Sequence, residues 1–386
     1  MSSERENKNR VYLDNAATTQ MSTEVKRAME PYLQRNFGNA STVYSYGEEA
    51  KEAMEHARRI IASSLWAKPS EIYFTSCGSE SDNWAVKCAA GECRQEGQHI
   101  ITSKIEHHAV LNSCEYLEKL GYEVTYLEVD EKGMVSPEAV LAAIRPDTTL
   151  ISIMFANNEV GTIEPIMQIG KIAREQGILF HTDAVQAYAQ IPIDLRRYPI
   201  DMLSASAHKF HGPKGVGFLY IREGVTLPSF IHGGGQEEGK RAGTENVAGI
   251  VGMGKAAELA FCDMGNRIRK ETMLRNYLLE KVMHEIPGVC INGHRSKRLP
   301  GNANFSFRGV DGASLVILLD EDGICASGGS ACNTGEERIS YVIRELKVPE
   351  DYAPGTIRMT LCGSTTREDI DRAVESLKKN VARLRD

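Results

Sequence analysis

Short apolar runs alternate with amphipathic stretches along the chain from residue 71 onward. The runs are rich in Val and Ile and have the length of buried strands, whereas the stretches between them carry apolar residues at helical spacing. We expect strands at 71–76, 99–103, 123–127, 149–156 and 178–183, and helices at 80–93, 109–120, 137–144 and 166–176. This alternation predicts an α/β fold, in which helices cover both faces of a mainly parallel central sheet.

A long helical pattern from about 247 to 284 leads out of this first unit. Beyond it, the pattern predicts strands at 288–292, 302–307 and 356–361 and helices at 312–320 and 368–384. The later part of the chain is therefore expected to form a second, smaller α/β domain.

Composition is ordinary for a water-soluble globular protein, with 42% apolar and 25% charged residues among 386. The formal net charge is −7 and the sequence has no dense block of Lys or Arg, which argues against nucleic acid or an anionic membrane as the main partner. No apolar run is long enough to span a bilayer, and the polar N-terminus resembles neither a signal peptide nor a transit peptide. These features predict a cytoplasmic protein.

The nine cysteines are an odd number, and most lie within apolar or helical patterns. In a cytoplasmic chain of this size, that distribution predicts buried free thiols and no disulfide framework. A C-x-x-C pair is missing, and the pair His208 and His211 has no third ligand nearby, so no metal site is expected.

Residues 204–215 lie between the apolar runs 200–203 and 215–221, and they are expected to form a loop between two strands. Small and hydroxyl-bearing residues lead up to Lys209, whose amine becomes a nucleophile able to form a Schiff base when burial or a nearby cation lowers its pKa. The neighbouring hydroxyls and backbone N–H groups suit a phosphate, and pyridoxal phosphate (PLP) is a phosphorylated aldehyde. The alternative is a surface lysine in a Gly/Pro turn.

Further polar residues follow the expected strands, at the edge of the sheet where ligands of such folds bind. Residues 76–81, 106–108 and 157–161 come after three of these strands. Asp183 ends another, and its carboxylate is costly to bury without a cationic partner. The protonated ring nitrogen of PLP would be such a partner, on the opposite side of the ring from Lys209.

Two reactive side chains lie in the later part of the chain. Cys332 belongs to a glycine-rich polar stretch, 327–338, which predicts an exposed mobile loop and suits a thiol nucleophile that must travel. Arg358 lies within an expected strand, and its guanidinium suits a substrate carboxylate or, equally, a structural ion pair.

With these residues in place, the chain closely resembles the cysteine desulfurases, PLP enzymes of the class V aminotransferase group. The resemblance covers nearly the whole chain and depends on the stretches 12–19, 80–83, 102–107, 157–161, 181–186, 208–215, 232–235, 241–244 and 330–332. It implies a fold-type I PLP enzyme that is a homodimer with shared active sites. Its large PLP-binding domain would comprise residues 14–260, and its small domain residues 1–13 and 261–386.

The resemblance also implies a role for each matching residue. Lys209 would form the Schiff base with PLP, Asp183 would face the pyridine nitrogen, Gln186 would bond the ring hydroxyl, and His107 would stack on the ring and assist proton transfer. The phosphate would be held by Ser79, Ser206 and His208, with Thr244 from the other subunit. Asn158, Arg358 and Asn15 would bind the substrate. L-cysteine would become L-alanine, and Cys332 would accept the sulfur as a persulfide.

The implied partner is a sulfur-acceptor protein, either a scaffold or a sulfur carrier, that serves iron–sulfur cluster or other thio-cofactor biosynthesis. Cys332 could contact a cluster during transfer, although no resident metal is expected. Relatives usually have Gly-Ala-Thr where this chain has Cys77-Gly78-Ser79, and commonly a proline in the helix start that reads Ile339-Ser340-Tyr341-Val342 here. Relatives that dock an iron–sulfur scaffold often carry a C-terminal extension beyond the position of Asp386. Alternative functions are selenocysteine lyase, another class V PLP enzyme, and a non-catalytic sulfur-relay subunit.

Overall fold

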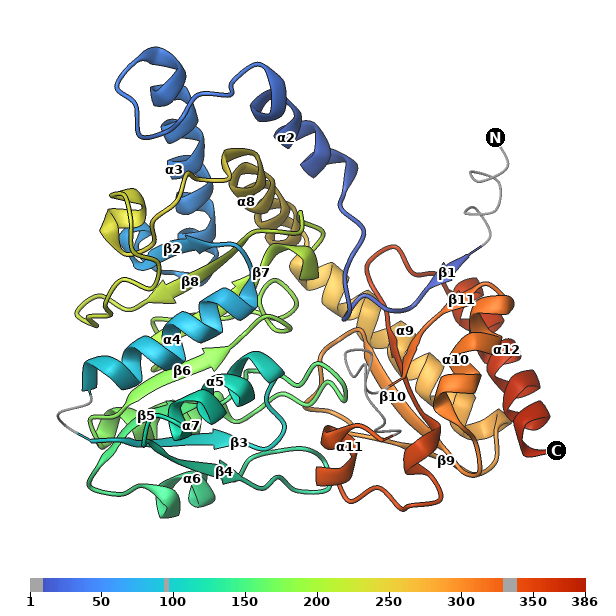
Figure 1. The fold of residues 1–386 in the computed structure, drawn as a ribbon. Coiled ribbons are helices and arrows are strands. Elements are labelled where there is room, and N and C mark those ends of the chain that lie inside the picture. The colour runs from blue at the N-terminus through green and yellow to red at the C-terminus, as the bar shows by residue number, and fades with distance from the viewer. Residues whose placement is uncertain (1–9, 94–96, 329–338) are drawn as a thin grey trace.

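The computed structural model describes residues 10–93, 97–328 and 339–386. A seven-stranded sheet in the order β2-β8-β7-β6-β5-β3-β4 forms the centre of the large domain (Figure 1). Its strands are β2 (Ile72–Thr75), β3 (His99–Ser103), β4 (Glu123–Leu127), β5 (Thr148–Ser152), β6 (Leu179–Asp183), β7 (Met202–Ser206) and β8 (Gly217–Ile221). All neighbours pair in parallel except β8, which is antiparallel to both β7 and β2. The sheet is thus mainly parallel, as predicted.

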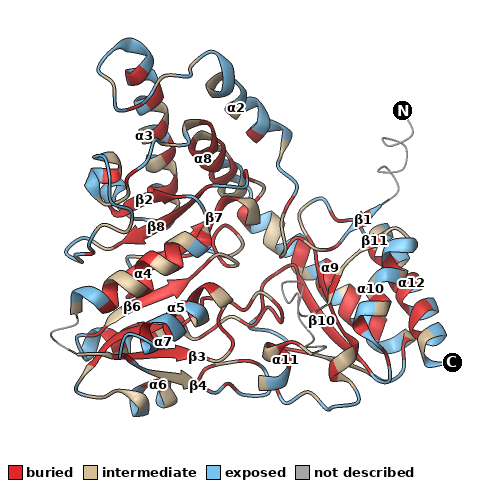
Figure 2. Ribbon diagram, in the orientation of Figure 1, coloured by how far each residue is buried: buried red, intermediate tan, exposed pale blue. Residues whose placement is uncertain are grey.

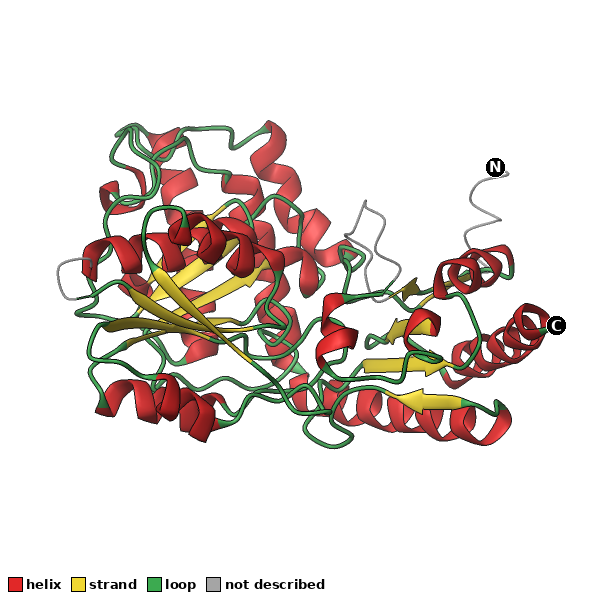
Figure 3. Cartoon of the chain, turned by 60° about the horizontal axis from the view of Figure 1, so that its bottom comes forward, coloured by secondary structure: helices red, strands yellow, loops and turns green. Residues whose placement is uncertain are grey.

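Helices cover this sheet on both faces (Figure 3). They are α2 (Thr23–Gln34), α3 (Ser45–Leu65), α4 (Gly78–Glu92), α5 (His108–Glu118), α6 (Pro137–Ala143), α7 (Ile166–Glu175) and α8 (Val247–Cys262). Successive strand residues point to opposite faces. Ile100 belongs to the cluster beneath α4 and α5, whereas Ile101 belongs to the larger cluster that contains the apolar side chains of α3 and α8. The strands are therefore apolar on both sides and entirely buried at the centre (Figure 2).

The small domain is built around the antiparallel sheet β12-β13-β10-β9, beside the parallel pair β1-β11. The strands are β1 (Val11–Tyr12), β9 (Val289–Ile291), β10 (Asn302–Phe307), β11 (Ile324–Cys325), β12 (Ser327–Gly328) and β13 (Thr356–Thr360), and the helices are α9 (Met264–Glu285), α10 (Gly312–Glu321), α11 (Tyr341–Glu345) and α12 (Arg367–Arg385). A separate apolar cluster joins the sheet to α9, α10 and α12. β1, near the N-terminus, and α12, near the C-terminus, thus belong to the same small domain.

The structure corrects three of the expected elements. The helical pattern 247–284 is broken at Asp263, whose non-helical backbone separates α8 from α9. The strand expected at 149–156 ends at Ser152. Ser204 and Ser206, expected in a loop, lie in β7, so the segment that follows is shorter and more constrained than predicted.

The cysteine prediction is right about pairing and wrong about burial. The eight cysteines in the described part of the chain are all free, but only Cys114 is buried, and Cys262 is exposed. Within the same described residues, no helix combines the length and apolar character needed to cross a membrane.

Candidate active site

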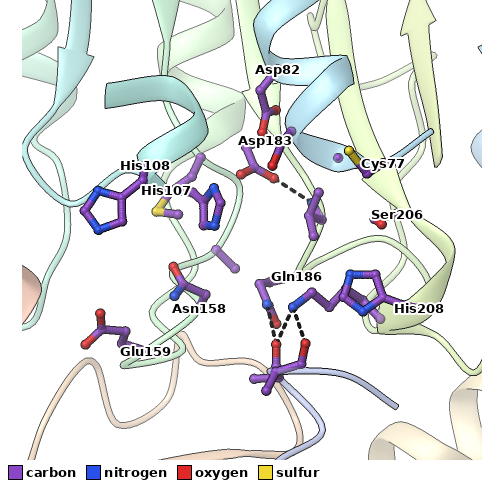
Figure 4. Close-up of a pocket in the computed structure, with 18 of the residues that line it drawn as sticks. Cys77, Asp82, His107, His108, Asn158, Glu159, Asp183, Gln186, Ser206 and His208 are labelled. Carbon is purple, nitrogen blue, oxygen red and sulfur yellow. Dashed lines mark hydrogen bonds between the residues drawn. The ribbon is translucent and has the colours of Figure 1, made fainter. Parts of the chain in front are cut away.

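A cavity of about 410 Å³ lies between the two domains, at the carboxyl ends of the parallel strands (Figure 4). The large domain contributes His107 after β3, Asn158 after β5, Asp183 at the end of β6 and Lys209 after β7. The small domain contributes Arg358 from β13. Side chains that are far apart in the sequence therefore face one space, where doubly wound α/β folds bind their ligands.

Lys209 ends a single 3₁₀ turn (Ala207–Lys209) that follows β7 directly. Its Nζ donates hydrogen bonds to the carbonyl oxygens of Ala16 (2.6 Å) and Ala17 (2.8 Å), drawn as dashed lines in Figure 4. The Gln186 side chain donates to the same oxygen of Ala16 (3.0 Å). The amine is thus held at the cavity by backbone and side-chain contacts that involve the Ala16 and Ala17 carbonyl oxygens.

Two buried acids, Asp183 and Asp82, lie on the opposite side of the cavity. Asp183 is 5% exposed and accepts a hydrogen bond from the backbone N–H of Val185 (2.8 Å). Burial raises the pKa of Asp183, whereas nearby His107 lowers it. Burial and the neighbouring Asp183 raise the pKa of Asp82 well above its usual value. Ligand atoms of Asp82, Asp183 and His107 lie within 4.8 Å of one another, so a cationic group bound here would favour the charged forms of the two acids.

His107 is the N-cap of α5, and its Nδ1 accepts the backbone N–H of Ala109 (3.1 Å). Burial lowers the pKa of His107, so the ring is neutral near pH 7 and carries its proton on Nε2. A neutral ring beside Asp183 can lie against a flat aromatic ligand and can donate or accept a proton. His107 thus lies in the cavity, and its predicted role stays a prediction.

The third part of the cavity is suited to a phosphate. Gly78 begins α4, and a Cβ there would come within 2.6 Å of Val185 Cγ2, so a larger residue would require the Val185 side chain to shift. The first backbone N–H groups of a helix, here those of α4, have no acceptor within the helix and attract anions. Ser79, Ser206 and His208 line the same region of the cavity. Burial and the adjacent Lys209 lower the pKa of His208 to about 4, which leaves a neutral ring that can still donate a hydrogen bond.

Arg358 provides the cationic end of the cavity. It is 5% exposed, and its guanidinium donates from Nη2 to Asp14 Oδ1 (2.9 Å) and from Nη1 to the carbonyl oxygen of Asn158 (2.9 Å). Within the described part of the chain, Arg358 Nε and Asn158 Oδ1 are buried without a hydrogen-bond partner. Buried polar atoms of this kind are costly unless a ligand satisfies them.

The donor set as a whole fits PLP. A lysine faces the cavity, a buried acid pair suits the ring nitrogen, a helix N-terminus with hydroxyls suits the phosphate, and an arginine suits the carboxylate of an amino acid. The predicted residues that line the cavity are Lys209, His107, Asp183, Gln186, Ser79, Ser206, His208, Asn158 and Arg358.

Three predicted residues are not among them. The Asn15 amide donates to the carbonyl oxygen of Thr360 (2.7 Å), and Thr244 is exposed outside the cavity. Cys332 lies outside the described residues. Their roles stay predictions.

Sequence reasoning missed three buried or half-buried residues of the cavity, namely Asp82, Glu159 and Tyr341. Asp82 could have been found, because it falls at helical spacing from the apolar Val86 and Ala89, on the face that an amphipathic helix buries. Glu159 is 4% exposed, and burial raises its pKa to about 7. Tyr341 donates its hydroxyl to the carbonyl oxygen of Glu106 (2.5 Å), a long-range contact that leaves no mark in the local sequence.

Comparison with known proteins gives the family. Residues 11–373 match the family described as aminotransferase class-V. The chain is 52% identical to the cysteine desulfurase IscS of Dictyoglomus turgidum, over 98% of this chain and 96% of that protein. Its fold matches a solved NifS-like protein with a TM-score of 0.91, at 39% identity over 97% of this chain and 99% of that one. A structure of SspA in complex with cysteine matches with a TM-score of 0.82, at 39% identity over 92% and 99% of the two chains.

The chain therefore belongs to the class V aminotransferases, which are PLP enzymes. Within that family its place is among the cysteine desulfurases. The predicted family and the predicted fold class are both confirmed.

Proposed function

We propose that the chain is a PLP-dependent cysteine desulfurase, which converts L-cysteine to L-alanine and transfers the sulfur to Cys332. The observation that carries this proposal is the placement of Lys209 and Arg358 on one cavity, with Asp183 buried beside it. An amino acid needs an anchor for its carboxylate and a group for its α-proton, and the two cations supply these.

Bound PLP would supply an aldehyde that captures the amino group of the substrate and a cationic ring that withdraws electrons from its α-carbon. Asp183 would keep the ring nitrogen protonated. Arg358 and Asn158 would orient the carboxylate, so that the α-proton faces Lys209. The free amine of Lys209, which can hydrogen-bond the carbonyl oxygens of Ala16 and Ala17, can accept this proton. His107, neutral near pH 7, is the second group able to move it.

The sulfur step is a displacement at the substrate sulfur. The thiolate of Cys332 attacks that sulfur, an S–S bond forms as the carbon–sulfur bond breaks, and the electron pair of the broken bond stays with the carbon. Protonation of the carbon gives L-alanine, and the protein retains a persulfide. Overall, one thiol and L-cysteine give one persulfide and L-alanine, so no outside oxidant or reductant is needed.

We also propose that the protein is a homodimer in which Thr244 reaches the phosphate in the partner's cavity. Support comes from the connection between α2 and α3, where Phe37, Val43 and Tyr44 are 72%, 92% and 58% exposed. This connection projects from the large domain as an exposed tip (Figure 2). Large apolar side chains gathered at an exposed tip favour a protein contact. Thr244 is also exposed, as a residue that serves another subunit should be.

The sulfur acceptor is proposed to be a scaffold or carrier protein in iron–sulfur cluster or thio-cofactor biosynthesis, in keeping with the name of the relatives. A cytoplasmic location is proposed on the sequence features given above. Selenocysteine lyase is the alternative activity, and comparison of L-cysteine with L-selenocysteine as substrates would separate the two.

The decisive experiment measures alanine and sulfide released from L-cysteine by the purified, PLP-loaded protein with a reducing thiol. We expect equal amounts of both. Lys209→Ala should lose the visible absorption of lysine-bound PLP, and Cys332→Ser should keep this absorption and lose turnover. If the loaded protein makes no alanine, the proposed activity is wrong; normal turnover in Cys332→Ser would remove the persulfide from the reaction.

A further inference from the structure

Residues 14–19, which we call the interdomain strap, cross from the small domain to the large one. The strap follows β1 and leads toward α2 (Figure 1). Its first half is bonded to β13. Asp14 Oδ1 accepts from Arg358, the Asn15 amide donates to the carbonyl oxygen of Thr360 (2.7 Å), and the Ala16 N–H donates to the Thr360 hydroxyl (2.8 Å). The strap is therefore fixed at this end to the strand that carries Arg358.

The second half of the strap is bonded to the segment that carries Lys209. The carbonyl oxygens of Ala16 and Ala17 accept from Lys209 Nζ. The N–H of Thr19 donates to the carbonyl oxygen of His208 (2.8 Å), and the hydroxyl of Thr19 donates to the same oxygen (2.9 Å). Only a few backbone bonds separate the carboxylate that holds Arg358 from the oxygens that hold Lys209. We therefore expect a shift at one end of the strap to alter the hydrogen bonds at the other.

The contact between Asp14 and Arg358 conflicts with binding of a ligand carboxylate. A carboxylate that bonds a guanidinium in two places uses a pair of N–H donors on one edge. Nη1 of Arg358 is already bonded to the carbonyl oxygen of Asn158, which leaves the edge formed by Nε and Nη2. Nη2 is the atom that Asp14 Oδ1 occupies. Two carboxylates at one buried nitrogen repel each other, so an arriving carboxylate and Asp14 compete.

We propose that Asp14 is a positioning residue that holds Arg358 until a substrate carboxylate displaces it, and that this displacement loosens the strap's hold on Lys209. The inference rests on the proposed roles of Arg358 and Lys209. The displacement of Asp14 would make the Lys209 amine most mobile once the substrate carboxylate is bound to Arg358. This is the stage at which Lys209 must transfer the α-proton. The coupling is reciprocal, because a strap held by Lys209 also favours the contact of Asp14 with Arg358.

The first test uses cofactor-free protein and propionate, a monocarboxylate that has no amino group and cannot react at the cofactor site. Hydrogen exchange of the Ala16 and Thr19 amides is followed as propionate is added. Binding usually slows exchange at nearby amides. Displacement of Asp14 should instead speed exchange at both strap amides severalfold. Slower or unchanged exchange, or failure of propionate to bind, would overturn the inference.

The second test compares Asp14→Asn with the unchanged protein. Asn removes the competing charge, so the dissociation constant of propionate should fall about fivefold, the scale of a well-placed ion pair. The strap amides should already exchange fast without propionate. If Asp14 had only a structural role, Asp14→Asn would loosen the strap and would also weaken the binding of propionate. Such a result would refute the proposal.

Asp351→Asn is the matched control, because it makes the same chemical change at the exposed Arg308–Asp351 pair, which belongs neither to the strap nor to the cavity lining. It should leave both readouts unchanged. If Asp14→Asn does not fold, the exchange response of the unchanged protein decides the question. Alanine release is measured separately. A strap response without alanine would refute only the desulfurase activity, and alanine without a strap response would refute only this inference.

Discussion

Glu106 offers the sharpest test of the electrostatics beneath the cavity. It precedes His107, its side chain is inaccessible to solvent, and its Oε1 accepts from the Ser103 hydroxyl (2.6 Å) and from the Met154 N–H (2.9 Å). Within the described residues, its Oε2 has no partner. Burial raises the pKa of Glu106 from 4.5 to about 8, and nearby Asp183 adds to the effect. Near neutral pH, the folded protein thus holds a proton that the unfolded chain releases.

The sign of the pH dependence follows from this difference. The unfolded chain binds fewer protons than the folded protein between pH 4.5 and 8, so the free energy of unfolding falls as pH rises through that window. The two pKa values correspond to a loss of about 5 kcal/mol across the window, of which about 3 kcal/mol has accumulated at pH 7. Glu106→Gln keeps the acceptor oxygen and removes the titration.

We therefore expect Glu106→Gln to reduce the pH dependence, of which Glu159 still contributes a part, and to be the more stable protein at pH 8. The assay is urea unfolding of the cofactor-free protein from pH 5 to 8.5. Glu175→Gln, at an exposed position near the end of α7, is the control and should follow the unchanged protein. Parallel curves for Glu106→Gln and the unchanged protein would show that Glu106 does not titrate in this range, and the reasoning would fail.

Two further predictions concern neighbouring parts of the site. His107→Gln should lower the rate of alanine release about 100-fold or more, the usual scale for a lost acid–base group. Burial lowers the pKa of His107 below 6.5, so the rate of the unchanged protein should not fall between pH 7 and 8 through titration of His107. Arg58→Met should lower the free energy of unfolding by about 3 kcal/mol or more, since it leaves Glu237 (3% exposed side chain) as a buried charge without its partner. Urea unfolding measures this loss, and adding Glu237→Gln should recover part of it; no recovery would show that the pair is not the cause.

Local sequence was sufficient to predict the residues that end strands. Asp183 and Lys209 follow apolar runs, and parallel strands bring their carboxyl ends to one edge, so the two could be placed together before any coordinates. The predicted ends of helices and strands were less accurate where tertiary contacts determine them. Ser204 and Ser206 have loop-like side chains, but β7 is held on both sides by β6 and β8, and this pairing extends the strand through them.

Contacts between the domains could not be predicted in this way. Asp14 and Arg358 meet across nearly the whole length of the chain, and neither residue's neighbours in the sequence indicate the other. The same is true of Tyr341 and Glu106. A charged residue in a short apolar strand indicates that a partner exists, but its identity depends on how the two domains pack.

The buried acids of the cavity give a physical reason for it to favour a cationic ligand. His181 lies 3.6 Å from Asp82, yet its ring nitrogens bond the hydroxyls of Ser152 and Ser204, and burial lowers its pKa to about 3. This histidine is therefore neutral and does not offset the acids above it. The charge of Lys209 lowers the pKa of Asp183, but burial outweighs it and the pKa stays raised. Burial therefore disfavours the charged form of both Asp82 and Asp183, and a protonated ring nitrogen bound beside them would favour it. A preference for a cationic ring such as that of PLP would thus arise from the buried acids themselves, independently of the substrate.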